Sequence, residues 1–302
     1  MSSPYFRVIK GNFVIIGKEP DGDSVRFVAD NPDLYKALRN AFRIKPSRDG
    51  SVQLRFEAVD APELHYGSAL QPLGAASRDA LLGWMGFSNI QYTTQQAAGS
   101  APVPTRVVSC DPERVPGAIL TKLAEANGRP VSYVLVGDDA GGLTDGAWVH
   151  VNNAILGKTM NLRLLTEGMA YYTVYNSTPY EQLPVLREAA SNARKNNLGV
   201  WAIDSTGDFV LEDQTSISPP DGQLILPKLF RRCTDYLKDV NQNGFSGNLS
   251  DWLLAHSSGS RIENDHVLIN NSIEVQLSDL ISQRNREIVF QPDLMDIIFI
   301  EK

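Results

Sequence analysis

The sequence contains little cysteine and histidine. Of its 302 residues, only two are cysteine and four are histidine. Cys110 and Cys233 lie far apart in the chain, so we expect free thiols in a reducing compartment rather than a disulfide. His150, His256 and His266 are too scattered along the chain to predict a zinc site.

Long apolar runs and several well-known catalytic motifs are also absent from the sequence. No run of about 18 apolar residues occurs, which argues against a transmembrane helix. Residues 1–7 show no charged start followed by an apolar stretch, so we expect a cytoplasmic protein without a secretory signal. Residues 138–142 lack the lysine and hydroxyl of a phosphate-binding loop, which argues against a nucleoside triphosphatase. No serine or cysteine nucleophile motif stands out.

The acidic net charge of the chain is confined to its C-terminal third. Residues 1–204 contain 20 basic and 20 acidic residues, whereas residues 205–302 contain 8 and 15. The neutral part can still present a locally positive groove to a polyanion. The acidic part should repel nucleic acid, which argues against tight non-specific duplex binding there.

The first 203 residues are predicted to form a barrel of β-strands with helices around it. Alternating or apolar segments predict strands at 6–16, 24–29, 52–59 and 131–136, with an extra strand at 148–151. Helical spacing predicts helices at 31–42 and 71–87, and Thr178 with Glu181 predicts a capping box at the start of another. Segments near 31–45 and 95–126 are interpreted as insertions, the second opening with a loop at 95–105.

A second, smaller unit follows this region. Residues 204–222 are rich in Ser, Pro, Asp and Gly, which is typical of a linker. Beyond it, a helix at 224–240 and strands at 266–269, 272–280, 287–291 and 296–301 are predicted. We expect residues 223–302 to form an α+β or all-β module, and its function is not apparent from the sequence.

Two short segments carry the chemistry. Residues 21–25 read Asp-Gly-Asp-Ser-Val, and residues 55–63 read Arg-Phe-Glu-Ala-Val-Asp-Ala-Pro-Glu. Carboxylates beside an arginine are suited to holding a hard metal ion next to a phosphate, and phosphodiester cleavage needs little else. Because a strand does not continue comfortably through Pro62, Glu63 is free to point into a cleft.

Three later motifs follow in a fixed order. They are Gly128-Arg129, the segment 161–170 (Asn-Leu-Arg-Leu-Leu-Thr-Glu-Gly-Met-Ala) and the segment 198–201 (Leu-Gly-Val-Trp). Together with the two acidic segments, this order and spacing resemble the staphylococcal nuclease (thermonuclease-like) family over roughly residues 10 to 203. The resemblance implies a mainly β, α+β fold: a five-stranded OB-fold barrel with flanking helices. It also implies a calcium-dependent nuclease that hydrolyses DNA and RNA and leaves 3′-phosphates.

The resemblance assigns a role to each acidic residue. Asp23 and Asp60 would ligate Ca²⁺ together with the backbone carbonyl of Ala61. Glu63 would orient or deprotonate the water that attacks phosphorus, and the sequence leaves both roles open.

The resemblance assigns the phosphate to two arginines. Arg55 and Arg129 would bind it through paired hydrogen bonds and stabilise the transition state. Arg106 is the alternative to Arg129, because Asn127 stands where the family usually has an aromatic residue. A nucleotide-contacting tyrosine is also expected, and the sequence leaves three candidates: Tyr171, Tyr172 and Tyr175.

This site requires a bend in the chain. Five residues of straight strand would separate Arg55 from Asp60 by about 16 Å and place them on opposite faces. We therefore predict a bulge or sharp bend between Phe56 and Asp60.

A binding protein is the alternative to a nuclease. A catalytically silent OB-fold module could bind oligonucleotides or a protein partner instead. Clustered carboxylates beside a phosphate site argue against it, because a binder has no need for them. A shallow barrel groove suits splayed strands, so single-stranded substrate is expected to be preferred.

Overall fold

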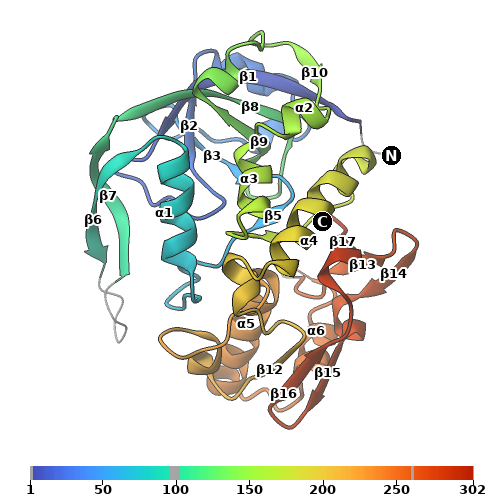
Figure 1. Ribbon diagram of the computed structural model, residues 1–302. Coiled ribbons are helices and arrows are strands. Elements are labelled where there is room, and N and C mark those ends of the chain that lie inside the picture. The colour runs from blue at the N-terminus through green and yellow to red at the C-terminus, as the bar shows by residue number, and fades with distance from the viewer. Residues whose placement is uncertain (1–2, 96–102, 260–261, 302) are drawn as a thin grey trace.

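The computed structural model describes residues 3–95, 103–259 and 262–301. Its upper part is a twisted β-barrel, and its lower part is a separate group of helices and short strands formed by the C-terminal third of the chain (Figure 1). The predicted class, a mainly β, α+β fold of the OB type with flanking helices, is confirmed.

The barrel sheet is built on its two longest strands. β1 (Tyr5–Val14) pairs antiparallel with β8 (Arg114–Ala124) through eight register positions, and β8 pairs antiparallel with β9 (Pro130–Val136). The strand order is β3-β2-β1-β8-β9-β4, with β2 (Arg26–Ala29), β3 (Val52–Gln53) and β4 (Arg55–Phe56) completing it. The predicted extra strand is β10 (Trp148–His150), which pairs with β1.

β8 changes the interpretation of the segment near 95–126. From Arg114 onwards this segment is a central strand of the barrel sheet and not an insertion, because its apolar side chains are buried between β1 and β9. Before it, β6 (Ser88–Gln95) and β7 (Val103–Asp111) pair as a hairpin that extends beside the barrel (Figure 1). Most of the loop predicted at 95–105 lies outside the described residues.

The predicted strand at 52–59 is broken where the site requires it. β4 ends at Phe56, and β5 (Val59–Asp60) runs in a different sheet, paired with β11 (Tyr171–Tyr172). Between them, Ala58 has a left-handed backbone with φ of 66°. The predicted bend between Phe56 and Asp60 is therefore confirmed.

Helices cover one side of the barrel. They are α1 (Gly74–Trp84), α2 (Asn153–Leu156), α3 (Met160–Thr166) and α4 (Leu183–Lys195). The helix predicted at 31–42 is instead two 3₁₀ turns, η1 (Pro32–Ala37) and η2 (Ala41–Arg43). Short 3₁₀ turns also occur as η3 (Gly137–Ala140), η4 (Tyr180–Gln182) and η5 (Gly199–Ala202).

The capping box predicted at Thr178 is wrong. α4 begins five residues later than Thr178, after η4, and has no side-chain cap. The Thr178 hydroxyl donates instead to the buried carboxylate of Glu57. A buried acid that needs a donor outcompetes a local cap here.

The C-terminal third forms its own small sheets around two helices. The helices are α5 (Pro227–Asn243) and α6 (Leu249–Ala255), and the 3₁₀ turns are η6 (Gln214–Ile217), η7 (Leu277–Leu280) and η8 (Leu294–Asp296). One sheet contains β12 (Asp208–Val210), β16 (Glu287–Phe290) and β15 (Ile281–Arg284). The other contains β14 (Ile273–Gln276), β13 (His266–Ile269) and β17 (Ile297–Phe299). Because β12 pairs with β16, the segment predicted as a linker contributes a strand to this unit.

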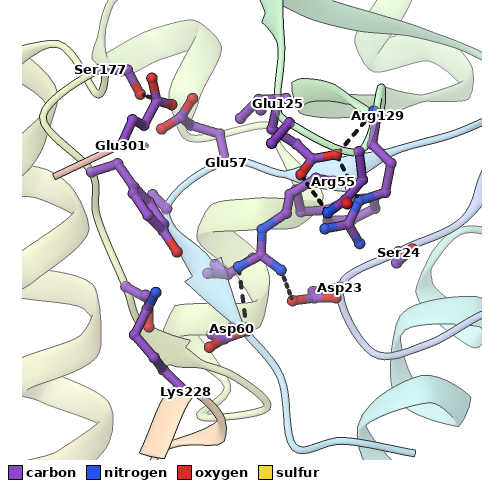
Figure 2. A pocket seen from close by; sticks show the side chains of 18 of the residues that line it. Asp23, Ser24, Arg55, Glu57, Asp60, Glu125, Arg129, Ser177, Lys228 and Glu301 are labelled. Atoms are coloured by element: carbon purple, nitrogen blue, oxygen red, sulfur yellow. Dashed lines mark hydrogen bonds and ion pairs between the residues drawn. The ribbon is translucent and has the colours of Figure 1, made fainter. Parts of the chain in front are cut away.

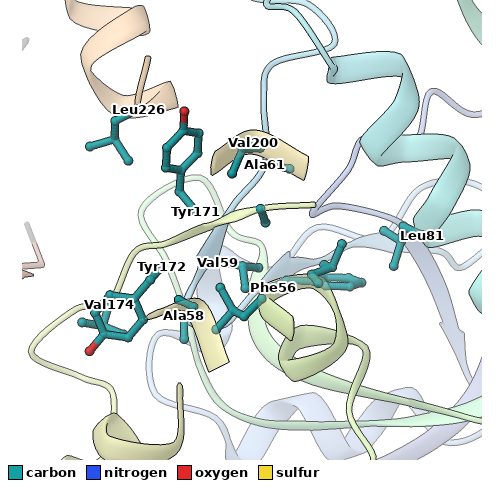
Figure 3. Packing of buried hydrophobic residues seen from close by; sticks show 14 of the residues in the cluster. Phe56, Ala58, Val59, Ala61, Leu81, Tyr171, Tyr172, Val174, Val200 and Leu226 are labelled. Atoms are coloured by element: carbon teal, nitrogen blue, oxygen red, sulfur yellow. The ribbon is translucent and has the colours of Figure 1, made fainter. Parts of the chain in front are cut away.

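The barrel and the C-terminal unit share one apolar core. Tyr171 of the barrel region and Leu226, just before α5, belong to the same buried cluster (Figure 3). The backbone N–H of Phe299 donates to the carbonyl of Val174 over 2.9 Å, so β17 lies against the barrel segment that follows β11. Both cysteines are free, as predicted. Among the described residues, no helix combines the length and apolar character needed to cross a membrane.

Candidate active site

A pocket of about 500 Å³ lies where the barrel meets the C-terminal unit. Its walls come from the bend between β4 and β5, the turn between β8 and β9, the start of α5 and the residues after β17. Six basic and eight acidic side chains line it, so a charged ligand would meet both signs at close range. Figure 2 shows Arg55 extending across this pocket between Asp23 and Asp60.

Asp23 is positioned by a tight turn that precedes β2. The backbones of Asp21 and Ser24 form an isolated bridge, and the N–H of Phe56 donates to the carbonyl of Asp23 over 3.1 Å. Gly22 allows this turn to approach α1 closely, because a Cβ there would lie 2.5 Å from the hydroxyl of Ser77. The turn therefore presents the Asp23 carboxylate next to β4.

Arg55 connects the two acids that the sequence predicted as metal ligands. Its guanidinium nitrogens lie 3.3 Å from Oδ1 of Asp60 and 3.6 Å from Oδ2 of Asp23. The Asp23 carboxylate also accepts the N–H of Ala61 over 3.3 Å. Arg55, Asp23 and Asp60 therefore lie close together, and the bend between β4 and β5 makes this possible.

The side chain of Asn161 on α3 stabilises the bend between β4 and β5 through hydrogen bonds to backbone groups. Its amide nitrogen donates to the carbonyls of Glu57 and Ser132 over 2.9 and 3.0 Å, and its oxygen accepts the N–H of Val134 over 2.9 Å. The side chain is fully buried. Asn161 thus fixes the backbone after Arg55 against β9, which explains its place in the motif at 161–170.

Glu63 faces an unexpected partner from the C-terminal unit. Its backbone N–H donates to the Gln71 side chain over 3.1 Å, which fixes the chain after Pro62. The Glu63 carboxylate forms an ion pair with Arg231 of α5. The same guanidinium donates to both oxygens of Asp60, over 2.9 and 3.3 Å. Arg231 therefore bridges two of the predicted site acids.

Arg129 lies at the turn between β8 and β9. Gly128 has φ of 82°, and a Cβ at this position would lie 2.2 Å from the carbonyl oxygen of Arg43. Arg129 lines the pocket, and its Nε lies 3.1 Å from Oε1 of Glu125. Arg106, the alternative, does not line the pocket, so the placement favours Arg129.

The three candidate tyrosines are separated by the fold. Tyr171 and Tyr172 lie in β11 and are buried, and the Tyr171 hydroxyl donates to Asp204 over 2.8 Å. Tyr175 lines the pocket. Tyr175 is therefore the tyrosine placed to meet a ligand.

Burial and mutual repulsion shift the pKa values of the site acids. Burial raises the pKa of Glu63, against the opposing charge of Arg231, and repulsion from Asp60 adds to the rise. Burial also raises the pKa of Asp23, with Arg55 opposing the rise. For Asp60, burial is outweighed by Arg231 and Arg55, which hold the pKa of this carboxyl below its usual value. Asp60 is thus kept as a carboxylate.

As arranged, these residues do not fit a calcium ion. Carboxylate and carbonyl oxygens are the right donors for it. However, the Asp60 carboxylate accepts two guanidinium groups, Asp23 faces Arg55 and Glu63 faces Arg231. Within residues 3–95, 103–259 and 262–301, no group of three acidic, histidine or cysteine side chains lies close enough to hold a metal ion.

The sequence interpretation missed the basic residues of α5. Lys228, Arg231 and Arg232 all line the pocket. Lys228 lies 3.6 Å from Asp265 and 4.5 Å from the centre of the Phe299 ring, and Arg232 contacts Asp265 over 2.8 Å. Three of the eight basic residues after position 204 fall within these five positions, which was the available signal.

Comparison with known proteins gives one family. No curated protein matches the chain. Residues 109–203 match the model of the family described as staphylococcal nuclease homologue. This range includes β8, β9, Arg129, α3 with Asn161, and Tyr175. Residues 109–203 are therefore similar to the staphylococcal nuclease family, within the range of about 10 to 203 over which the sequence resembles it.

Proposed function

We propose that this protein hydrolyses phosphodiester bonds of DNA and RNA in the pocket around Arg55. The observation that carries the proposal is the close grouping of Arg55, Asp23 and Asp60 with Glu63, in a pocket that residues of the family match at 109–203 also line. A nuclease or nucleic-acid-binding role follows from the family match in general terms.

The arginines would bind the scissile phosphate. The guanidinium group of Arg55 contacts two carboxylates, so its orientation is fixed before the substrate binds. A guanidinium offers paired hydrogen bonds that match phosphate oxygens, and it stabilises the extra negative charge of the transition state. Arg129, on the turn between β8 and β9, also lines the pocket and would bind the same phosphate.

Glu63 is the proposed general base. Burial raises its pKa, and a carboxylate with a raised pKa is a better proton acceptor near neutral pH. It would take a proton from a water that attacks phosphorus in line with the departing 5′-oxygen. Breaking that bond leaves the phosphate on the 3′ side, which is the product we propose.

Single-stranded substrate fits this pocket best. The site is a pocket between two units of the protein, and pockets of this volume enclose ligands of about nucleotide size. A flexible strand can turn a nucleotide into such a pocket, whereas a duplex would have to open first. Tyr175 is placed to stack on the base or sugar.

We include calcium dependence in the proposed function only for a site in which the guanidinium contacts of the carboxylates have rearranged. Among the described residues, the carboxylates of Asp23, Asp60 and Glu63 all face guanidinium groups. The steps above are therefore written for the side chains alone. Departure of the Arg231 guanidinium would remove one of the two cationic partners of Asp60, whereas Asp23 would still face Arg55. Asp23, Asp60 and the Ala61 carbonyl remain the residues that would hold Ca²⁺ in such a rearranged site.

The experiment is cleavage of a fluorescent single-stranded oligonucleotide in Ca²⁺ or in EGTA. We expect cleavage by the wild type and a loss of roughly 10²-fold or more in Arg55→Ala and Glu63→Gln. Mass spectrometry of the ends should find 3′-phosphates, and a duplex of the same sequence should be cut more slowly.

The matched control is Arg114→Ala, which removes an exposed arginine at the start of β8, outside the pocket. This variant should keep wild-type activity. If the wild type binds the oligonucleotide without cutting it under either condition, the silent OB-fold binder replaces the nuclease.

A further inference from the structure

Arg231 forms ion pairs with Asp60 and Glu63, two of the acids on which the proposed site depends. Its guanidinium donates to both carboxylate oxygens of Asp60, over 2.9 and 3.3 Å, and pairs with Glu63. The Asp60 side chain is 1% exposed and that of Arg231 is 18% exposed. A buried carboxylate needs a cation close by, and this one has Arg231 in addition to Arg55.

The helix that carries Arg231 and the residues just before it are held by two hydrogen bonds from the chain that follows Glu63. The Tyr66 hydroxyl donates to Asp235 of α5 over 2.7 Å, and the Gln71 side chain donates to the Ile225 carbonyl over 2.7 Å. Tyr66 and Gln71 belong to the chain that follows Glu63. The contact of Arg231 with Asp60 and Glu63 is therefore part of a docked interface and not a loose surface ion pair.

The other two basic side chains of α5 that line the pocket form their ion pairs elsewhere. Arg232 is engaged by Glu263 and Asp265, and Lys228 by Asp265. Only Arg231 of these three contacts Asp60 or Glu63 in the described part of the chain. Arg231 is therefore the basic residue of α5 that contacts these two carboxylates, and it shares Asp60 with Arg55.

We propose that Arg231 is a built-in cation that competes with a divalent metal ion for the carboxylate of Asp60. This inference rests on the proposed function for the identity of the ion, because it takes Ca²⁺ as the competitor. The C-terminal unit would then set the metal affinity of the nuclease-like domain. Ca²⁺ would bind only in the fraction of molecules in which the guanidinium has left.

The expected effect follows from that competition. Apparent affinity falls in proportion to the fraction of molecules able to bind, so removing the competing guanidinium raises affinity by the inverse of that fraction. If about one molecule in ten has Arg231 displaced, the gain is about tenfold.

The experiment is calorimetric titration of CaCl₂ into the full-length protein. Arg231→Met removes the charge and keeps most of the length, and it should bind Ca²⁺ about tenfold more tightly than the wild type. Arg231→Lys keeps a positive charge and should bind more weakly than Arg231→Met. Ca²⁺ should also raise the melting temperature of Arg231→Met by more than that of the wild type.

Arg232→Met is the matched control. It removes the same charge one position along α5, where the side chain pairs with Glu263 and Asp265. If the competition is direct, this variant should bind Ca²⁺ with nearly wild-type affinity. An equal gain in both variants would show a general effect of charge and would overturn the proposal.

A measurement on the unmodified protein covers the case in which Arg231→Met does not fold. In crystals of the wild type saturated with Ca²⁺, the guanidinium of Arg231 should lie away from Asp60. Calcium bound to Asp60 with Arg231 still in place would refute the competition. Because these readouts measure binding, they stand apart from cleavage: a protein that cuts nothing can still show the competition, and an active one can lack it.

Discussion

At the scale of single residues, the geometry of the site depends on side chains that do not line the pocket. Asn161 is the clearest case, since its three hydrogen bonds join α3 to the bend at Glu57 and to β9. The bend brings Arg55 to within 3.3 Å of Asp60. A residue from the fourth motif of the family pattern therefore supports residues of the second.

We predict that Asn161→Ala lowers the free energy of unfolding by about 2–4 kcal/mol, because buried backbone groups lose their partners. Urea unfolding at neutral pH measures this. Asn153→Ala, at an exposed position of α2, is the control and should change stability by less than about 0.5 kcal/mol. A loss below that value in Asn161→Ala would show that the bend holds without it.

At the scale of elements, the hairpin of β8 and β9 carries Arg129 into the pocket. The backbone N–H of Gly128 donates to the Glu125 carbonyl over 2.9 Å, which closes a tight turn. Its φ of 82° is disfavoured for residues with a side chain. The turn also packs against the backbone of Arg43, in the segment of 3₁₀ turns that follows β2.

We predict that Gly128→Ala costs about 1–3 kcal/mol of stability, since the new methyl group meets the Arg43 carbonyl oxygen and the backbone is strained. Weaker binding of oligonucleotide should accompany it, because Arg129 is displaced. Thermal unfolding and fluorescence anisotropy measure the two effects. Gly142→Ala is the control, because a Cβ there meets nothing within 4 Å. Similar losses in both variants would contradict the steric explanation.

At the scale of the whole molecule, the C-terminal unit completes both the core and the pocket. A bidentate ion pair joins α4 of the barrel region to the C-terminal unit. The two Arg194 nitrogens lie 2.7 and 2.9 Å from the Asp293 oxygens. This hydrogen bonding lowers the pKa of Asp293. Because the folded pKa lies below the unfolded one, the pair stabilises the protein above about pH 4 and is lost as pH falls further.

We predict that Asp293→Asn destabilises the protein by about 0.5–1 kcal/mol at pH 7, a small value because both side chains are more than 40% exposed. The difference from wild type should shrink as pH is lowered from 5 towards 3. Denaturant unfolding of both proteins across this range measures it. Asp221→Asn is the comparison, since Asp221 is exposed in the same unit and none of the ion pairs among the described residues involves it. A difference independent of pH would rule out the ion pair as its cause.

The sequence by itself determined the features that depend on local patterns or on the order of motifs along the chain. The Asp-Gly-Asp turn, the arginine at 55 and the acids at 60 and 63 predicted a bend, because straight strand geometry could not bring them together. The apolar pattern of 131–136 and of 266–269 likewise matched the strands found there. Thr178 was misjudged because its hydroxyl is used by Glu57, 121 positions away in the chain.

Only the tertiary structure decided what faces the predicted site. Arg231 lies 168 positions after Glu63, and no local pattern states which surface of α5 docks on the barrel. The basic cluster in α5 was visible as charge, but its partners depend on how the two units pack. Tyr175 was separated from Tyr171 and Tyr172 for the same reason, because strand pairing with β5 buries one pair and leaves the third at the pocket. Periodicity and turn chemistry act over a few residues, whereas the ion pairing of this site is set by the contact between the barrel region and the C-terminal unit.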